Sequence, residues 1–396
     1  MASSALPALT DGDVVAVEKP PGPRWIPLLD AIWESGAAVL PIDHRLGADE
    51  RDRLLRLGQP TVLVAGDETR RLDGSPAEPG TAAIVATSGS GGASRLVELS
   101  RVALVAAVTA SAEALDATGR DPWLCCIPVA HIGGLLVLLR HVVLDAAVDV
   151  HRRFELDAVC GEQTAVFTSL VPTQLHRLLE AGCDLRRWRA MLVGGAALPV
   201  AIRDAASTMT RIVRTYGLTE SCGGVVYNGR PLRGTEMRIA DDGEVQLRGA
   251  TMMRRYRLDD AATQTAFTVD GWLRTRDAGD IDGDGTLHVH GRMDDAISTG
   301  GETVWPLEVE TVLGEHPAVD EVAVVGRDDD EWGQRVVAIV VPASGALPTL
   351  DALRGFVTER LAVYKAPREI IIVDRLDRTA LGKVRRDRLP RRTSEE

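Results

Sequence analysis

Short apolar runs alternate with longer amphipathic ones through the first three quarters of the chain, and this alternation limits the possible folds most strongly. Runs at 39–42, 61–65 and 82–86 have strand length, whereas 48–57 and 101–115 have helical length and spacing. Strands that alternate with helices predict parallel sheets covered by helices, with ligands at the carboxyl ends of the strands. The other expected strands are 123–127, 165–168, 191–193 and 211–215, and the other expected helices are 25–33, 135–143, 173–181 and 199–207.

The pattern of apolar runs in the sequence changes near residue 235. Short apolar runs follow there, separated by Asp-Gly pairs that favour hairpin turns, which predicts a small antiparallel β unit closing the large domain. Mixed elements come next, with helices expected at 306–313 and 350–361 and strands at 321–325 and 335–341. We therefore predict an α/β fold: a large domain over residues 1–293, with parallel-rich sheets covered by helices and the small β unit, and a small α+β domain over residues 294–396.

Composition narrows the class of protein. A length of 396 residues exceeds one typical domain, and a net charge of −12 argues against nucleic-acid polymers and anionic membranes as partners. The longest uncharged apolar stretch, 124–139, is shorter than a membrane span, and the N-terminus does not resemble a signal peptide. Five irregularly spaced cysteines predict neither a disulfide framework nor a zinc ribbon. We expect a cytoplasmic protein with no membrane insertion.

Residues 87–95 form a Gly/Ser-rich segment between an expected strand and an expected helix. Small residues allow backbone N–H groups to approach an anion, and hydroxyl groups add donors, so Thr87, Ser88, Gly89, Ser90 and Gly91 are candidates for binding phosphate. The segment lacks the Gly-Lys-Ser/Thr ending of a Walker loop. Taken alone, a Gly/Ser-rich turn is more often a flexible connector.

Three further motifs are weak individually. Glu220 in the segment 216–220 follows an expected strand and could hold Mg²⁺, although a helix N-terminus would also favour an acid there. Asp277 and Arg292 lie in segments that could bind ribose hydroxyls, or could be ordinary solvated turns. Lys383 follows Gly382 and is one of only three lysines, against 42 arginines; a compact positive charge suits a phosphoryl oxygen, while a plain surface lysine is the alternative.

Taken in order, these motifs resemble the adenylate-forming superfamily, which includes acyl-CoA synthetases, luciferases and peptide-synthetase adenylation domains. The resemblance covers nearly the whole chain. It implies an ATP-dependent ligase that joins a carboxylic acid to AMP, releases pyrophosphate, and then passes the acyl group to coenzyme A. The cofactors implied are ATP, Mg²⁺ and coenzyme A, and the small C-terminal domain is expected to be mobile, with a hinge at Asp294.

The resemblance also implies roles for individual residues. Lys383, Thr219 and Glu220 would act on the α-phosphate, with Glu220 as the metal ligand. Tyr216 and Gly217 would meet the adenine, while Asp277 and Arg292 would hold the ribose. The remaining nucleotide and coenzyme A residues would be the phosphate loop, the adenine-edge residues Gly194, Gly195 and Ala196, and Gly300 and Gly301. Departures from the family pattern are Gly91, Arg95, Arg276 and Leu381.

The compact length and three runs of residues suggest which acid is the substrate. The runs, at 130–135, 169–175 and 222–227, resemble the corresponding segments of short actinobacterial-type o-succinylbenzoate–CoA ligases of menaquinone (vitamin K2) biosynthesis. Gly223 and Gly224, with Gly195, could line a slot for the aromatic ring. Candidates for the second carboxylate are His131, Ser169 and Thr173. His131 is also a candidate catalytic residue, or a packed histidine that only shapes the pocket, and Arg140 is expected to be a solvated helix residue.

Alternative functions stay open from the sequence. One is a CoA ligase for another aryl or medium-chain acid, and another is a non-catalytic nucleotide-binding paralogue, which the departures at 91, 95 and 381 would suit. A peptide-synthetase adenylation domain is disfavoured because no carrier domain follows residue 396. The expected partner is a small carboxylic acid; no nucleic acid is expected, and a homodimer is possible.

Overall fold

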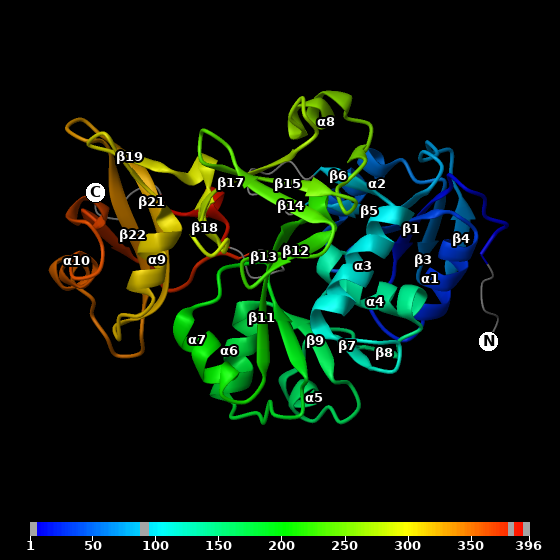
Figure 1. Ribbon diagram of the computed structural model, residues 1–396, viewed down its shortest axis with the longest axis horizontal. Coiled ribbons are helices and arrows are strands. Elements are labelled where there is room, and N and C mark those ends of the chain that lie inside the picture. The colour runs from blue at the N-terminus through cyan, green and yellow to red at the C-terminus, as the bar shows by residue number, and fades with distance from the viewer. Residues whose placement is uncertain (1–5, 88–94, 379–383, 391–396) are drawn as a thin grey trace. The chain divides into compact units, whose positions relative to one another are not determined.

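The computed structural model describes residues 6–87, 95–378 and 384–390 of the chain (Figure 1). The chain forms two compact units. The first comprises Met1–Leu198, Ile202–Met237 and Gln246–Arg274, and the second comprises Pro199–Ala201, Arg238–Val245 and Thr275–Glu396. The boundary between residues 293 and 294 and the hinge at Asp294 stay predictions.

The first unit contains two seven-stranded sheets. In the first sheet, β1, β2, β3 and β5 pair in parallel, while β4, β6 and β16 pair antiparallel with their neighbours. The strands predicted at 39–42, 61–65 and 82–86 are confirmed within one residue at either end. The spatial order is β16 (Arg255–Tyr256), β6 (Leu96–Ser100), β5 (Thr81–Ala86), β2 (Ala38–Pro41), β1 (Val14–Glu18), β3 (Val62–Ala65) and β4 (Glu68–Arg71).

The second sheet is parallel from β8 to β11 and antiparallel where β12 and β13 join it. Because β7, β9, β10 and β11 run in one direction, their carboxyl ends lie at one edge of the sheet. The spatial order is β13 (Arg230–Pro231), β12 (Gly223–Tyr227), β11 (Arg211–Leu218), β10 (Ala190–Val193), β9 (Phe167–Leu170), β7 (Trp123–Cys125) and β8 (Val148–Val150).

Helices α3 (Arg101–Leu115) and α4 (Ile132–Leu144) lie between these two sheets (Figure 1). They share one apolar core with α1 (Trp25–Glu34) and with residues of both sheets, such as Val39 and Phe167. Helix α2 (Ala48–Gly58) covers the outer face of the first sheet. The outer face of the second sheet packs against α5 (Leu156–Cys160), α6 (Pro172–Glu180) and α7 (Val200–Ser207). Helix α8 (Asp260–Ala266) follows β16 along the chain.

Arg140 differs from the sequence-based expectation, because its side chain is buried and only 3% of the residue is exposed. Its guanidinium donates to the Leu136 carbonyl at 2.7 Å and the Ser111 hydroxyl at 2.9 Å, and lies 3.8 Å from the Trp123 ring centroid. Burial lowers the pKa of Arg140 to about 10. The expectation of a solvated residue was wrong because α4 packs against helices α1 and α3 and against strands β7, β8, β9 and β12 of the second sheet.

The last two sheets are smaller. The predicted antiparallel β unit is present as the strand order β14 (Thr235–Ile239), β15 (Glu244–Gly249), β17 (Leu273–Ile281) and β18 (Leu287–Arg292). The other sheet packs against α9 (Pro306–Leu313) and α10 (Leu350–Thr358) around an apolar core that includes Val309, Val340 and Leu353. Its strands are β19 (Ile297–Thr299), β20 (Glu302–Val304), β21 (Val319–Asp329), β22 (Gly333–Pro342) and β23 (Glu369–Ile372).

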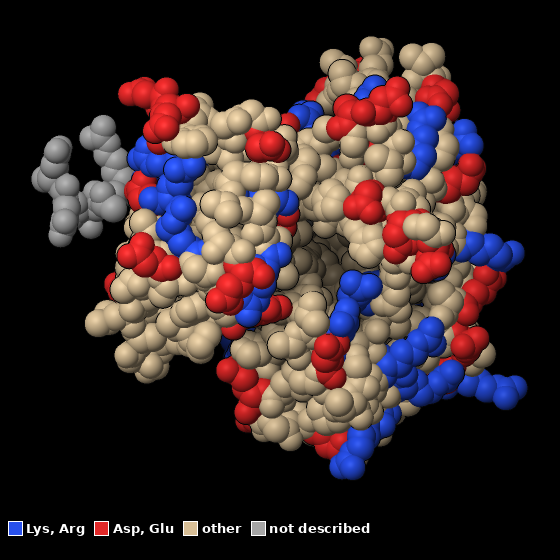
Figure 2. Space-filling model, turned by 60° about the vertical axis from the view of Figure 1, so that its left-hand side comes forward, with Lys and Arg blue, Asp and Glu red and all other residues tan. Residues whose placement is uncertain are grey.

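Two of the five cysteines are paired. Cys160 and Cys183 form one disulfide, with their Cα atoms 5.3 Å apart, and the other three cysteines are buried thiols, so there is no disulfide framework. Lys and Arg residues lie interspersed with Asp and Glu on the face shown in Figure 2. Within the described residues, no helix is both long enough and apolar enough to cross a membrane.

Candidate active site

The Gly/Ser-rich segment begins where β5 ends and finishes where β6 begins. Thr87 and Arg95 close it: the Thr87 N–H donates to the Arg95 carbonyl at 2.8 Å, and the Arg95 N–H donates to the Thr87 hydroxyl at 3.1 Å. The other loop residues singled out from the sequence, Ser88, Gly89, Ser90 and Gly91, lie outside the described residues. The paired strands β5 and β6 thus fix both ends of the segment.

Residues 216–220 lie at the carboxyl end of β11 and in the short 3₁₀ turn that follows it. Gly217 lies opposite Gly224 across the β11–β12 pair, and an added Cβ at Gly217 would lie 1.9 Å from the Gly223 carbonyl oxygen. The Ser221 hydroxyl accepts the Leu218 N–H at 2.9 Å and donates to the Gly223 carbonyl at 3.0 Å. This turn therefore has a fixed geometry that carries Thr219 and Glu220 at the sheet edge.

Glu220 is held by its backbone and by its carboxylate. Its carbonyl accepts the Met253 N–H at 2.7 Å, and its Oε1 accepts the Tyr256 hydroxyl at 2.8 Å. Burial and the nearby Glu220 charge raise the pKa of Tyr256, so the phenol stays protonated and acts as a donor. The carboxylate oxygens of Glu220 are hard ligands of the kind that Mg²⁺ prefers, so the residue predicted to hold the metal fits it.

Glycines at the ends of β10 and β12 bring backbone close to Thr215 on β11. A Cβ on Gly194 would lie 2.1 Å from the Thr215 hydroxyl, and a Cβ on Gly224 would lie 2.8 Å from the Thr215 Cβ. Gly195 has a φ of +82°, which side chains rarely adopt, and Gly195 and Ala196 are exposed. The backbone at these positions is therefore accessible beside Tyr216. A segment that contacts the edge of the adenine base requires such accessible backbone.

The candidates for the second carboxylate lie in the same unit. Ser169 is the third residue of β9, and exposed Thr173 lies in the first turn of α6, which follows β9. His131 precedes α4. Burial alone would raise the pKa of Asp43 in the same unit, but hydrogen bonds from Arg45 outweigh burial and lower that pKa. All three residues follow or lie within parallel strands whose carboxyl ends share one edge.

Asp277 and Arg292 are cross-strand partners on β17 and β18. The Arg292 guanidinium donates to Asp277 Oδ1 at 3.1 Å and to the Thr275 carbonyl at 2.9 Å. Asp277 is buried, and its N–H donates to the Thr275 hydroxyl at 3.1 Å. The pair therefore presents a carboxylate whose orientation is fixed, which is what an acceptor for sugar hydroxyls requires.

The other predicted residues of the second unit lie in turns. Gly300 and Gly301 connect β19 to β20 with φ values of +60° and +84°, and the Gly300 N–H donates to the Trp332 carbonyl at 2.8 Å. Asp294 lies in a 3₁₀ turn after β18, where Arg276 contacts it. Lys383 lies outside the described residues. Of the other two lysines, Lys365 pairs with Glu308 and Lys19 lies near Asp67.

Comparison with known proteins decides the family. The model for AMP-binding enzymes matches residues 67–257, and the model for the AMP-binding enzyme C-terminal domain matches residues 308–383. A probable 2-succinylbenzoate–CoA ligase of Mycobacterium tuberculosis is 40% identical over 338 residues, which cover 82% of this chain and 87% of that protein. The chain belongs to the AMP-binding enzyme family.

Further members of the family support the same placement. The 2-succinylbenzoate–CoA ligase of Listeria monocytogenes is 35% identical, over 79% of this chain and 70% of that protein. The indoleacetate–CoA ligase of Aromatoleum aromaticum is 32% identical, over 92% and 85% of the two chains. The o-succinylbenzoate CoA synthetase of Bacillus subtilis, solved with the acyl-adenylate OSB-AMP, has a TM-score of 0.88 and 27% identity, over 98% of this chain and 90% of that one. The α/β fold with a large N-terminal and a small C-terminal domain is thus confirmed.

Sequence reasoning missed Tyr256, which contacts the predicted metal ligand. It lies between Arg255 and Arg257 in a run with three arginines, which reads as an exposed segment. Met253 and Tyr256 are apolar or aromatic residues spaced within that basic run, and this spacing was the available signal of a buried side. No neighbouring residue indicates which element Tyr256 contacts. Its contact with Glu220 joins residues 36 positions apart.

Proposed function

We propose that this AMP-binding enzyme is an o-succinylbenzoate–CoA ligase that uses ATP and Mg²⁺ and serves menaquinone biosynthesis. The arrangement at the carboxyl edge of the second sheet supports the adenylation chemistry. There, Glu220 is held beside the glycine-lined backbone at 194 and 217. The relatives named 2-succinylbenzoate–CoA ligase, at 40% and 35% identity, support the choice of acid.

In the first step, a carboxylate oxygen of the acid attacks the α-phosphorus of ATP, and the bond to the β-phosphate breaks to release pyrophosphate. Thr219 donates to a phosphate oxygen, Tyr216 stacks on the adenine, and Asp277, oriented by Arg292, accepts the ribose hydroxyls. Lys383 places a positive charge at the α-phosphate as charge builds up there. Glu220 would hold Mg²⁺, which would supply further positive charge at the phosphates. The o-succinylbenzoate CoA synthetase of Bacillus subtilis has been solved with ATP and a magnesium ion, which supports this assignment.

In the second step, the thiol of coenzyme A loses its proton and attacks the acyl carbonyl carbon, and the bond to AMP breaks. The turn at Gly300 and Gly301 presents exposed backbone of positive φ, which a pantetheine chain can approach closely. A rotation about Asp294 between the two steps would exchange Lys383 for this turn. The hinge role of Asp294 is part of the proposal.

The acid is proposed to lie against the backbone of Gly223 and Gly224, which pack too closely against Leu136 and Thr215 to leave room for side chains of their own. An added Cβ at Gly223 would lie 2.8 Å from a methyl group of Leu136 on α4. His131, Ser169 and Thr173 supply polar atoms for the second carboxylate, and His131 is also retained as a candidate catalytic residue. A cytoplasmic location, a homodimer and the absence of a nucleic-acid partner are further parts of this proposal.

A second candidate substrate is another aryl acid such as indoleacetate, because the indoleacetate–CoA ligase is 32% identical over 92% of this chain. A panel of acids separates the two. Purified protein with ATP, Mg²⁺, coenzyme A and each acid in turn should release AMP and pyrophosphate fastest with o-succinylbenzoate. Active protein that exchanges pyrophosphate only with a different acid would exclude the proposed substrate.

A further inference from the structure

The segment Met253–Arg257 connects two places in the first unit that are far apart in sequence. The Met253 N–H donates to the Glu220 carbonyl at 2.7 Å. Strand β16 pairs antiparallel with β6, the strand that leaves the Gly/Ser-rich segment, with Tyr256 opposite Val97. The Arg257 N–H then donates to the Leu96 carbonyl at 2.7 Å. One short segment thus bridges the phosphate-loop stem and the turn that carries Glu220.

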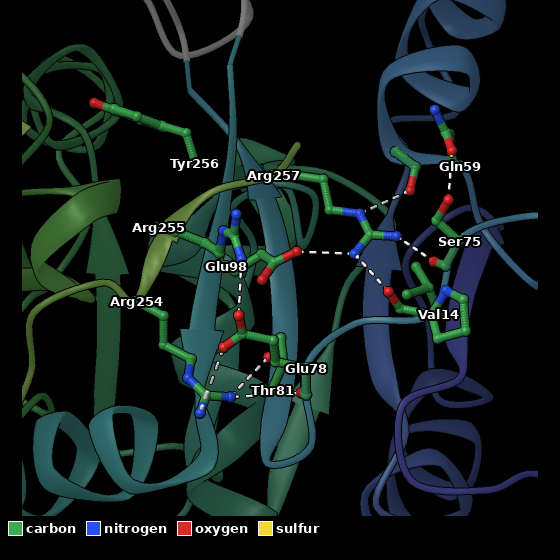
Figure 3. A network of polar contacts seen from close by, with 12 residues as sticks. Val14, Gln59, Ser75, Glu78, Thr81, Glu98, Arg254, Arg255, Tyr256 and Arg257 are labelled. Carbon is green, nitrogen blue, oxygen red and sulfur yellow. Dashed lines mark hydrogen bonds and ion pairs between the residues drawn. The ribbon is translucent and has the colours of Figure 1, made fainter. Parts of the chain in front are cut away.

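Arg257 fixes the position of this segment (Figure 3). Its guanidinium donates to Glu98 Oε1 at 2.8 Å, to the Gly58 carbonyl at 3.0 Å, and to the carbonyls of Ser75 and Pro76. The side chains of Arg257 and Glu98 are 2% and 3% exposed. A buried arginine with this many acceptors tolerates little displacement, so the register of β16 on β6 is set.

Tyr256 points away from Arg257, as successive residues of a strand do (Figure 3). With Arg257 anchored on one side, the phenol is directed to the other side, where its hydroxyl reaches Glu220 Oε1 at 2.8 Å. The guanidinium of Arg95, the residue that closes the Gly/Ser-rich segment, lies 5.2 Å from the centroid of the Tyr256 ring. The phenol is thereby placed between the end of that segment and Glu220.

We infer that Tyr256 is a positioning residue that fixes the Glu220 carboxylate in the orientation in which it binds Mg²⁺ with ATP. The inference rests on the proposed function. The hydroxyl occupies one lone pair of Oε1 and leaves Oε2 and the second lone pair of Oε1 for other ligands. Without this hydrogen bond, the carboxylate can rotate, and more Mg²⁺ is needed to form the same complex.

Tyr256→Phe tests the inference, with Tyr364→Phe in the second unit as the matched loss of a phenol hydroxyl. Calorimetric titration with ATP over a series of Mg²⁺ concentrations measures binding without turnover. We expect the Mg²⁺ concentration for half-maximal ATP binding to rise about 3- to 10-fold in Tyr256→Phe, which corresponds to the net loss of one hydrogen bond of ordinary strength. ATP binding without Mg²⁺ and the thermal midpoint should stay near wild type, and Tyr364→Phe should match wild type throughout.

Glu220→Gln and the double variant Tyr256→Phe/Glu220→Gln complete the test. If Tyr256 acts through Glu220, the double variant should need no more Mg²⁺ than Glu220→Gln alone. An unchanged Mg²⁺ requirement in Tyr256→Phe, or an additive loss in the double variant, would overturn the inference. If the wild-type chain binds no ATP at any Mg²⁺ concentration, the proposed function and this inference both fail.

Discussion

Arg276 and Asp294 form an ion pair in which one guanidinium nitrogen, Nη2, donates to both carboxylate oxygens, at 2.7 and 2.9 Å. Arg276 occupies the middle position of the Thr275–Asp277 motif, where the family usually has glycine, and its φ is +59°. Its N–H donates to Glu244 at 2.9 Å. Arg276, whose backbone is in the left-handed conformation, thus contacts Asp294, the residue proposed as the hinge.

Arg276→Gly should change the free energy of unfolding by less than about 1 kcal/mol. Glycine suits the positive φ, which offsets the loss of an exposed ion pair worth roughly 0–1 kcal/mol. Arg276→Ala loses the same pair and keeps the backbone strain, so it should be less stable than the glycine variant by about 1 kcal/mol. Urea unfolding of both variants measures the difference; equal stability would show that the left-handed backbone costs nothing here.

Lys383→Ala should slow acyl-adenylate formation by about 100-fold or more, because it removes a charge that stabilises the reacting phosphate. Thioester formation from supplied acyl-adenylate should stay within a few-fold of wild type. Pyrophosphate release and thioester formation, each followed separately, check this split. A similar loss in both half-reactions would refute the role proposed for Lys383.

Arg257→Met should destabilise the first unit by on the order of 3–5 kcal/mol, because it leaves the buried Glu98 carboxylate without its charge partner. The double variant Arg257→Met/Glu98→Leu should recover part of this loss, since both charges are then absent. The urea midpoint of each variant measures the effect. A double variant less stable than Arg257→Met would contradict this account of the pair.

Asp13 should make stability depend on pH at the acid end. Burial alone would raise its pKa, but hydrogen bonds from Thr61, Thr10 and Arg71 outweigh burial and lower the pKa. A lowered pKa stabilises the folded state above the ordinary aspartate value of about 3.9, and this contribution is lost as pH falls through the folded-state value. Asp13→Asn should be less stable at pH 7 by roughly 1–3 kcal/mol.

The Asp13→Asn variant should also lose less stability than wild type between pH 5 and pH 2.5, because it has no carboxylate to protonate at this position. Unfolding at several pH values measures both curves. Parallel acid limbs in the two proteins would show that Asp13 does not contribute this dependence.

Local signals explain which elements could be predicted from the sequence. Helices α3 and α9 have the predicted bounds because their starts are encoded nearby: the Ser100 hydroxyl accepts the Ala103 N–H, and Glu308 accepts the Trp305 N–H beside Pro306. Helix caps and amphipathic spacing depend only on neighbouring residues. The parallel strands of the two large sheets were found for a similar reason, as runs of buried apolar residues.

Elements that depend on distant partners could not be predicted. Strand β6 contains Glu98, which reads as an exposed residue but is buried against Arg257, 159 positions away. Strand β17 continues past Thr275, through Asp277 to Ile281, because Asp277 pairs with Arg292 across the sheet. The residues singled out for the site came from motif order, whereas Tyr256 belongs to none of those motifs and emerged only from its contact with Glu220.

The substrate specificity of thioester formation tests the central claim most directly. Purified chain, with ATP, Mg²⁺ and coenzyme A, should form a coenzyme A thioester from o-succinylbenzoate with a kcat/KM at least about 100-fold above that for indoleacetate, because a site with polar partners for a second carboxylate rejects an acid that lacks one. AMP and pyrophosphate should appear in equal amounts with the thioester. Equal or higher kcat/KM with indoleacetate, or no AMP release by protein that binds ATP, would contradict the account.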